Sequence, residues 1–241
     1  MVNSKLTTSS TQEEVSLSDK GVERKTYLYL AAIFIAALVV CNLIANKFIE
    51  VDLGFKTFIL SAGVLPYPIT FLITDILSEI YGKKKTARIV WAGFTASIFV
   101  LGVIMLAQQF NAIEGSPVDD DTYNAVFGNS WRVIFASMTA YLCAQLIDVR
   151  IYHFWKRKTE GKHLWLRNNF STIFSQLVDT TLVVGVLFIG VKPASDIFLF
   201  IIDGWLFKML CAFIDTPLLY GATAFIRNKL GLQFGEEVIE D

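Results

Sequence analysis

The sequence contains few of the residues from which metal, redox and histidine-based sites are built. Its 241 residues include three cysteines and two histidines. Cys41, Cys143 and Cys211 each lie within an apolar stretch, without the spacing of a disulfide framework or a zinc site. His153 and His163 both lie in one basic, polar segment. We therefore expect no metal site and no cofactor, and we interpret the cysteines as small buried residues.

The sequence also lacks the motifs of several enzyme classes. It contains no P-loop, so it does not predict ATP hydrolysis by that route, and it contains no HExxH, GxSxG or CxxC pattern. Some membrane transferases use several aspartates and a metal, but their closely spaced Asp-Gly motif is also missing. The sequence predicts a protein that is not an enzyme.

Hydrophobic residues are abundant, at 54% of the chain, and they fall in blocks near the length that spans a bilayer. We predict an all-α integral membrane protein with six transmembrane helices. The expected spans are 26–47, 58–81, 87–108, 131–152, 168–191 and 195–226. The sixth block is long and contains Pro217, where we allow for a bend.

The second block is interrupted by Pro66-Tyr67-Pro68. Proline removes a backbone donor and disfavours helix in the residue before it, so we expect this span to be broken there. A broken span is tolerated at membrane depth only where protein covers it or where it lines a cavity. The interruption therefore indicates the interior of the bundle.

The predicted transport domain is residues 26–230, with a polar segment at each end. Residues 1–25 are rich in Ser, Thr, Gln and charge, which predicts a disordered cytoplasmic tail. Residues 231–241 form an acidic cytoplasmic tail in this prediction. Between the first two spans, residues 49–56 alternate apolar and polar side chains around Gly54, which predicts a short extracellular β-hairpin.

The distribution of Lys and Arg predicts the orientation. Alternate connecting segments, near residues 24–25, 83–88, 150–167 and 227–229, carry most of these residues, whereas the other side has few and also has the run Asp119-Asp120-Asp121. Loops with excess Lys and Arg stay in the cytoplasm. We therefore predict that both termini are cytoplasmic.

Two acids in the second span need an explanation. Asp75 and Glu79 are four residues apart and share a helix face. A charge at the centre of a membrane helix costs about 2.5–3.5 kcal/mol on insertion scales, so an acid in a span indicates a functional site. The alternative for Glu79 is an anchor for the helix end through Lys83, four residues later.

Other spans add polar side chains at regular spacing: Asn42, Gln145 with Asp148, Gln176 with Asp179, and Lys208 with Asp215. Asp179 and Lys208 both fall near the middle of their spans, so we expect them to face inward and pair, either at a binding site or as a purely structural pair. Gln145 and Gln176 could instead only join helices. Asp148 could be an interface or loop partner.

We predict that these groups bind the substrate, together with two aromatic side chains beside the broken helix that could stack on a ligand. The predicted substrate-binding residues are Asp75, Glu79, Asn42, Gln145, Gln176, Asp179, Lys208, Asp215, Tyr67 and Phe71.

With these residues in view, the chain resembles the VUT/YhhQ family of queuosine precursor transporters. The main block of the resemblance is Pro68-x-Thr70-Phe71-Leu72-x-Thr74-Asp75-xxx-Glu79-x-Tyr81-Gly82-Lys83-xxx-Ala87-Arg88. Supporting elements are Asn42, Ser175-Gln176-xx-Asp179-Thr180, Lys208 and Asp215-Thr216-Pro217-Leu218. The resemblance covers residues 42–220, while the long polar N-terminal segment lies outside the family pattern.

This resemblance implies uptake of 7-deazaguanine compounds, such as 7-cyano- or 7-aminomethyl-7-deazaguanine, across a bacterial inner membrane. The residues suit such a cargo, because carboxylates and amides recognise the hydrogen-bonding edges of a guanine-like ring. Partners are then a small purine-like molecule and the lipid bilayer, with no nucleic acid. The alternatives are a substrate-binding membrane subunit of an ATP-driven vitamin or nucleobase importer, and an intramembrane enzyme. The preferred deazaguanine, the coupling ion of a symporter and the formation of a homodimer stay open.

Overall fold

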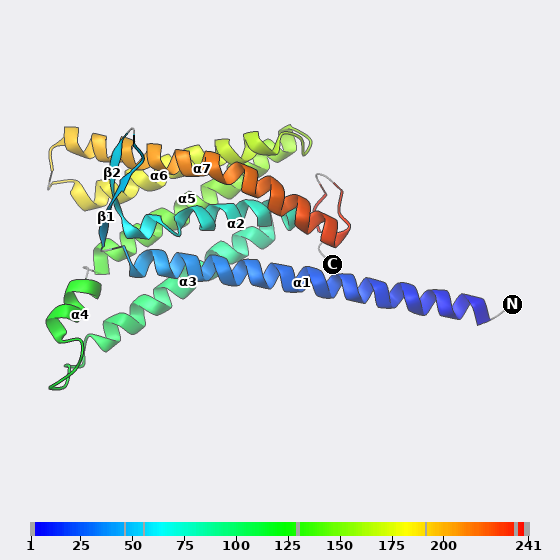
Figure 1. Cartoon of the computed structure of the whole chain (residues 1–241), viewed down its shortest axis with the longest axis horizontal. Helices are drawn as coiled ribbons and strands as arrows, with labels where there is room; N and C mark the ends of the chain where they lie inside the picture. The colour runs from blue at the N-terminus through cyan, green and yellow to red at the C-terminus, as the bar shows by residue number, and fades with distance from the viewer. Residues whose placement is uncertain are drawn as a thin grey trace.

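The computed structural model describes residues 3–45, 47–54, 56–128, 131–190, 192–233 and 236–238, with only the backbone described for residues 3–20, 48, 59, 131–137 and 187. In this part of the chain the elements follow one another as α1 (Asn3–Leu43), β1 (Phe48–Asp52), β2 (Thr57–Ser61), the 3-10 turn η1 (Ala62–Val64), α2 (Tyr67–Ile80), α3 (Gly82–Ala107), α4 (Asp120–Phe127), α5 (Trp131–Lys158), α6 (Leu164–Phe188) and α7 (Ala194–Leu230). Figure 1 shows the long helices gathered side by side in one bundle, with α4 at one end.

The chain is a helical membrane protein. Four helical stretches of the described residues are long and apolar enough to cross a membrane: Gly21–Leu43, Ala62–Ile80, Gly82–Ala107 and Ala194–Leu230. Helices α5 and α6 have 28 and 25 residues, which exceeds the roughly 20 residues that a span needs, but they carry more polar side chains. Six spans therefore stay a prediction.

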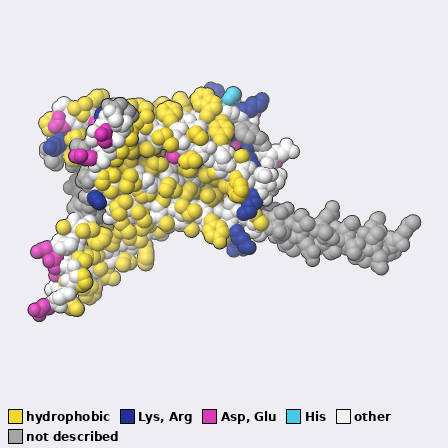
Figure 2. Space-filling view, in the orientation of Figure 1, with side chains coloured by type: hydrophobic (Ala, Val, Ile, Leu, Met, Phe, Trp, Pro, Cys, Tyr) yellow, Lys and Arg dark blue, Asp and Glu magenta, His cyan; other side chains and the backbone are white. Residues whose placement is uncertain are grey.

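The outer surface of the bundle is apolar. Phe99, Ile214 and Phe225 are about 70% exposed, and Figure 2 shows hydrophobic side chains over most of the visible face. Lys and Arg side chains gather at the end from which α1 projects, and most visible Asp and Glu side chains lie at the opposite end. An apolar patch of this extent is typical of a lipid-facing surface.

The segment between the first two helices forms a hairpin. Strands β1 and β2 pair antiparallel, with Phe48 opposite Ser61 and Asp52 opposite Thr57. The strands run beyond the predicted 49–56, and Phe58 belongs to β2 rather than to the second span. That part of the prediction was wrong because a strand with apolar residues looks the same, in composition, as the start of an apolar helix.

The predicted break in the second span is present. The 3-10 turn η1 ends at Val64, and α2 starts at Tyr67 with Pro68 in its first turn. Proline suits this position because the amide that it lacks has no partner within the helix there. By contrast, α7 continues through Pro217 as one helix.

Both end segments of the chain have described structure, and their assignment as cytoplasmic tails stays a prediction. Helix α1 begins at Asn3, so the backbone of residues 3–25 is helical where disorder was predicted; adding a residue to an existing helix needs no new nucleus. At the other end, the backbone amide of Val238 donates to the carbonyl of Ile80 at 2.8 Å. The segment with Val238 therefore returns to the bundle. Helix α4, which begins after Asp119 in the acidic segment, was not predicted.

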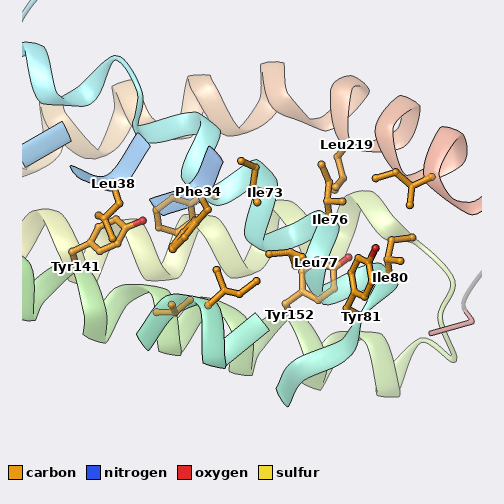
Figure 3. Close-up of a cluster of buried hydrophobic side chains, with 14 of the residues drawn as sticks. Phe34, Leu38, Ile73, Ile76, Leu77, Ile80, Tyr81, Tyr141, Tyr152 and Leu219 are labelled. Carbon is orange, nitrogen blue, oxygen red and sulfur yellow. The ribbon is translucent and has the colours of Figure 1, made fainter. Parts of the chain in front are cut away.

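Helix α2 lies in the middle of the bundle. It contacts α1, α3, α5 and α7, and Figure 1 shows it between α7 on one side and α1 and α3 on the other. Leu77 and Ile80 are fully buried, and Figure 3 shows them among side chains from several helices, including Phe34, Tyr152 and Leu219. The acids of α2 are therefore held inside protein.

Candidate functional site

A small cavity lies where α2, α6 and α7 meet. It is lined by Val64, Tyr67, Pro68, Phe71, Thr172, Gln176, Lys208, Cys211, Ala212 and Asp215. Its volume is about 20 Å³, which holds about one water molecule. Half of the predicted substrate-binding residues line this space. In this conformation the space is too small for a purine, so the helices must separate before such a molecule enters.

One wall of the cavity is an ion pair. The ammonium of Lys208 and the hydroxyl of Tyr67 each lie 2.7 Å from Asp179 Oδ2. The Lys208 ammonium also lies 4.3 Å from the centre of the Tyr67 ring, within cation–π range. The predicted pairing of Asp179 with Lys208 is confirmed. Because Lys208 and Tyr67 also line the cavity, the pair is more than a distant structural contact.

Gln176 on α6 lacks the hydrogen bonds that a buried amide needs. Its side chain is 1% exposed, it lines the cavity, and neither its amide nitrogen nor its amide oxygen has a partner among the described residues. An unsatisfied buried polar group costs about 1–3 kcal/mol. A ligand that supplies both a donor and an acceptor would remove this penalty.

Gln145 and Asn42 are placed behind the cavity rather than on its wall. The Gln145 amide donates to the Tyr141 hydroxyl at 2.8 Å, and the Tyr141 ring packs edge-on against Tyr67, with centroids 5.5 Å apart. The Asn42 amide donates to a backbone carbonyl one turn earlier in α1. Gln145 therefore holds an aromatic side chain that supports the cavity, and Asn42 bonds to its own helix.

Asp75 on α2 faces Asp148 on α5. The two side chains are 2% and 0% exposed, and their carboxyl groups are close enough to interact with each other. The Ser175 hydroxyl donates to Asp148 Oδ1 at 3.0 Å. Asp148 is therefore an interface residue and not a loop residue. The nearby carboxyl group of Asp215 reaches the cavity.

Glu79 holds together the ends of four helices. Its side chain is fully buried. Its Oε2 lies 2.5 Å from Arg167 of α6, 3.0 Å from the Tyr152 hydroxyl and 3.5 Å from the Lys156 ammonium of α5. Arg227 of α7 bonds to the other oxygen. With two arginines and a lysine around one carboxylate, this is an ion-pair hub with no free face for a substrate.

The partners of Glu79 differ from the predicted anchor, which was Lys83. Glu79 meets cations from α5, α6 and α7, not Lys83, which is exposed at the start of α3. Lys156 also donates to the backbone carbonyl of Glu79 at 3.0 Å and to Glu237 at 2.7 Å. The predicted acidic tail thus supplies a second carboxylate to this end of the bundle.

Sequence reasoning missed several members of these clusters. Lys156, Arg167 and Arg227 were read only as signals of orientation, and Tyr141 and Tyr152 were not singled out. The available signal was the position of these residues at the ends of spans, where a Lys or Arg side chain can turn inward and pair with an acid at the same depth in the membrane. Among the residues that the structure describes, no group of His, Cys, Asp or Glu is placed to hold a metal ion.

Comparison with known proteins gives consistent matches. Residues 61–222 match the family described as "Putative vitamin uptake transporter". A protein of Bacillus subtilis (strain 168) named "Probable queuosine precursor transporter" is 33% identical over 168 residues, 69% of this chain and 72% of that protein. The "Queuosine precursor transporter" of Escherichia coli (strain K12) is 24% identical over 73% of this chain and 78% of its own length. No solved structure matches the chain.

Proposed function

This chain belongs to the family described as "Putative vitamin uptake transporter", and we propose that it imports queuosine precursors of the 7-deazaguanine class across the cytoplasmic membrane. The family consists of transporters and not enzymes. The names of the Bacillus subtilis and Escherichia coli relatives support the substrate class. In this proposal uptake is driven by a cation gradient, both termini are cytoplasmic, and the hairpin faces outward.

The residues that line the cavity suit a 7-deazaguanine. This ring system has N–H donors along its pyrimidine edge and a carbonyl acceptor beside them, as guanine has. The carboxylate of Asp215 accepts from the donors, and the amide of Gln176 donates to the carbonyl. Tyr67 and Phe71, whose rings are 5.3 Å apart, cover one face of the ring.

Lys208 and Asp179 close the site beside the substrate. Because each balances the charge of the other at 2.7 Å, the pair adds polarity without net charge. A substrate that displaces the Tyr67 hydroxyl from Asp179 would gain a bond to a carboxylate, which is stronger than a neutral hydrogen bond. A base with the wrong edge leaves these buried groups unpaired, and that loss produces selectivity.

The remaining predicted site residues support the cavity from outside. Gln145 holds Tyr141 in place, and Asn42 bonds to the backbone of its own helix, α1. Glu79 joins the ends of several helices. These roles follow from their present partners. Asp75 does not line the cavity but is near Asp215, which does, so it can respond to an occupied site without contacting the substrate.

The unsatisfied amide of Gln176 is the observation that carries the proposal, and uptake by the purified chain tests it. Proteoliposomes that contain only this protein should take up labelled 7-cyano-7-deazaguanine saturably. Unlabelled 7-aminomethyl-7-deazaguanine should compete, and pantothenate should not. Protein-free liposomes and an Asp121→Asn variant, altered at an exposed acid of α4, serve as controls.

Two outcomes would favour the other functions. Tight binding without uptake in these proteoliposomes would indicate a subunit that requires an ATP-driven partner. A chemically altered product, detected by chromatography of the internal contents, would indicate an enzyme. Uptake no faster than in protein-free liposomes, without binding, would contradict transport of this substrate class.

A further inference from the structure

The carboxyl pair of Asp75 and Asp148 is not used by substrate binding as described above. Both side chains are buried between α2 and α5. Asp75 Oδ1 and Asp148 Oδ2 have no hydrogen-bond donor among the described side chains. Two neighbouring carboxylate anions in a buried site repel each other, and one proton shared between them removes that repulsion. The burial and closeness of the two groups thus favour one shared proton in this conformation.

The side chains around the pair determine where its proton can go. Asp215 of α7, Arg167 of α6 and Tyr152 of α5 are near enough to Asp75 to interact with it electrostatically. Helix α6 also directs the hydroxyl of Ser175 at Asp148 and places the hydroxyls of Ser171 and Thr172 near it. Next along α2 is Glu79, whose charge is already matched by its hub.

The two remaining neighbours of α2 contribute apolar surface. Helix α1 packs Phe34 and Leu38, and helix α3 packs Ile89 and Val90, into the core around α2. The charged and titratable neighbours of Asp75 named above thus come from α5, α6 and α7. Among these neighbours of the Asp75–Asp148 pair, Asp215 also lines the cavity. Tyr152 and Arg167 also bond to Glu79 in the hub.

We propose that Asp75 and Asp148 form the proton-coupling site of transport, with one proton held between their carboxyl groups while the bundle is closed and released when α2 and α5 separate. Separation moves the two carboxyl groups apart and admits water, in which aspartate ionises at neutral pH. Asp215 lines the cavity and is also near Asp75. The substrate site and the proton site are therefore neighbours, and the occupancy of one can affect the other. This inference rests on the proposed function, since it names the ion that drives uptake.

Separate assays of exchange and of driven accumulation test the inference. Exchange of labelled for unlabelled 7-cyano-7-deazaguanine across proteoliposomes at equal pH needs binding and helix movement, but no net proton transfer. Accumulation against a gradient needs coupling: with one proton per substrate, a pH difference of about one unit drives about tenfold accumulation. Asp75→Asn, Asp148→Asn and the control Asp121→Asn are compared with the unmodified protein.

The inference expects exchange in all four proteins and accumulation driven by the pH gradient only in the unmodified protein and Asp121→Asn. Accumulation that persists in both Asp75→Asn and Asp148→Asn would overturn it, as would accumulation driven by sodium at equal pH. Loss of exchange in both variants, with melting temperatures unchanged, would assign the acids to substrate binding and also overturn it. If the unmodified protein shows no exchange, the proposed function itself fails.

Discussion

At the scale of single residues, Gln176 shows the clearest mismatch between burial and hydrogen bonding. Its amide is enclosed and has no hydrogen-bond partner among the described residues. Gln145, on the neighbouring helix, is equally buried; its nitrogen donates to Tyr141, and only its oxygen has no partner among the described residues. The same residue type therefore occurs once with a structural partner and once facing the cavity, and the two can be separated by mutation.

Replacing Gln176 with leucine should weaken substrate binding without lowering the stability of the fold. Gln176→Leu removes an unsatisfied amide while keeping a side chain of similar size, so we expect an unchanged or higher melting temperature. Gln145→Leu breaks a bond and should lower stability by about 1 kcal/mol. Thermal unfolding of the purified variants in detergent measures both. A melting temperature of Gln176→Leu several degrees below that of the unmodified protein would indicate a structural amide.

Neutralising Glu79 should damage the fold more than it damages any single transport step. Glu79→Gln leaves Arg167, Arg227 and Lys156 without their common carboxylate, and breaking a buried ion pair costs about 3–5 kcal/mol. The control Glu23→Gln removes a partly exposed partner of Lys85 at 3.3 Å, which should cost less than about 1 kcal/mol. Yield and unfolding temperature compare the two, and equal values would contradict the role of Glu79 as a hub.

The sequence indicated Asp75 and Glu79 but not their partners. Asp75 and Glu79 stand out because a charge in an apolar span is unfavourable, and helical spacing places them on one face. That spacing says nothing about which other helix lies opposite. Asp148 and Arg167 come from segments more than 60 residues away, so their contacts with these acids depend on the packing of the bundle.

At the scale of elements, the link between α2 and α3 depends on Gly82. This residue has a φ of +76°, a conformation that L side chains rarely adopt. A Cβ at this position would also meet the carboxylate of Glu237. The link therefore requires glycine for its backbone angle and for the close approach of the C-terminal segment.

Gly82→Ala should consequently destabilise the protein by about 1–2 kcal/mol, the usual cost of a left-handed conformation with a Cβ. Gly102→Ala is the matched control, because Gly102 lies inside α3 with no atom near the position of a Cβ. That change should stabilise the helix by about 0.5–1 kcal/mol. Unfolding temperatures that move in the same direction for both variants would contradict this assignment.

The order and approximate ends of the long helices could be read from apolar length and from the Pro66–Pro68 interruption. The full length of the hairpin, α4 and the return of Val238 to α2 were harder to obtain. Strand β2 is apolar and adjoins an apolar helix, so composition does not separate them. The contact of Val238 with Ile80 spans most of the chain, and no local pattern indicates it.

At the scale of the whole molecule, the separation of charge along the bundle predicts its orientation. Lys229, near the end of α7, should face the cytoplasm, and Asp121, in α4, should face outward. In a background with the native cysteines replaced, Asp121→Cys should react with a membrane-impermeant maleimide in intact cells. Lys229→Cys should react only after permeabilisation. The reverse pattern would contradict the orientation.

The most direct test of the central claim is equilibrium binding of labelled 7-cyano-7-deazaguanine to the purified protein in detergent. The account predicts saturable binding that is weakened about tenfold or more in Gln176→Leu, a loss of at least about 1.4 kcal/mol, and that is unchanged in Asp121→Asn. Equal affinity in the unmodified protein and Gln176→Leu, with both folded, would contradict a binding site between α2, α6 and α7.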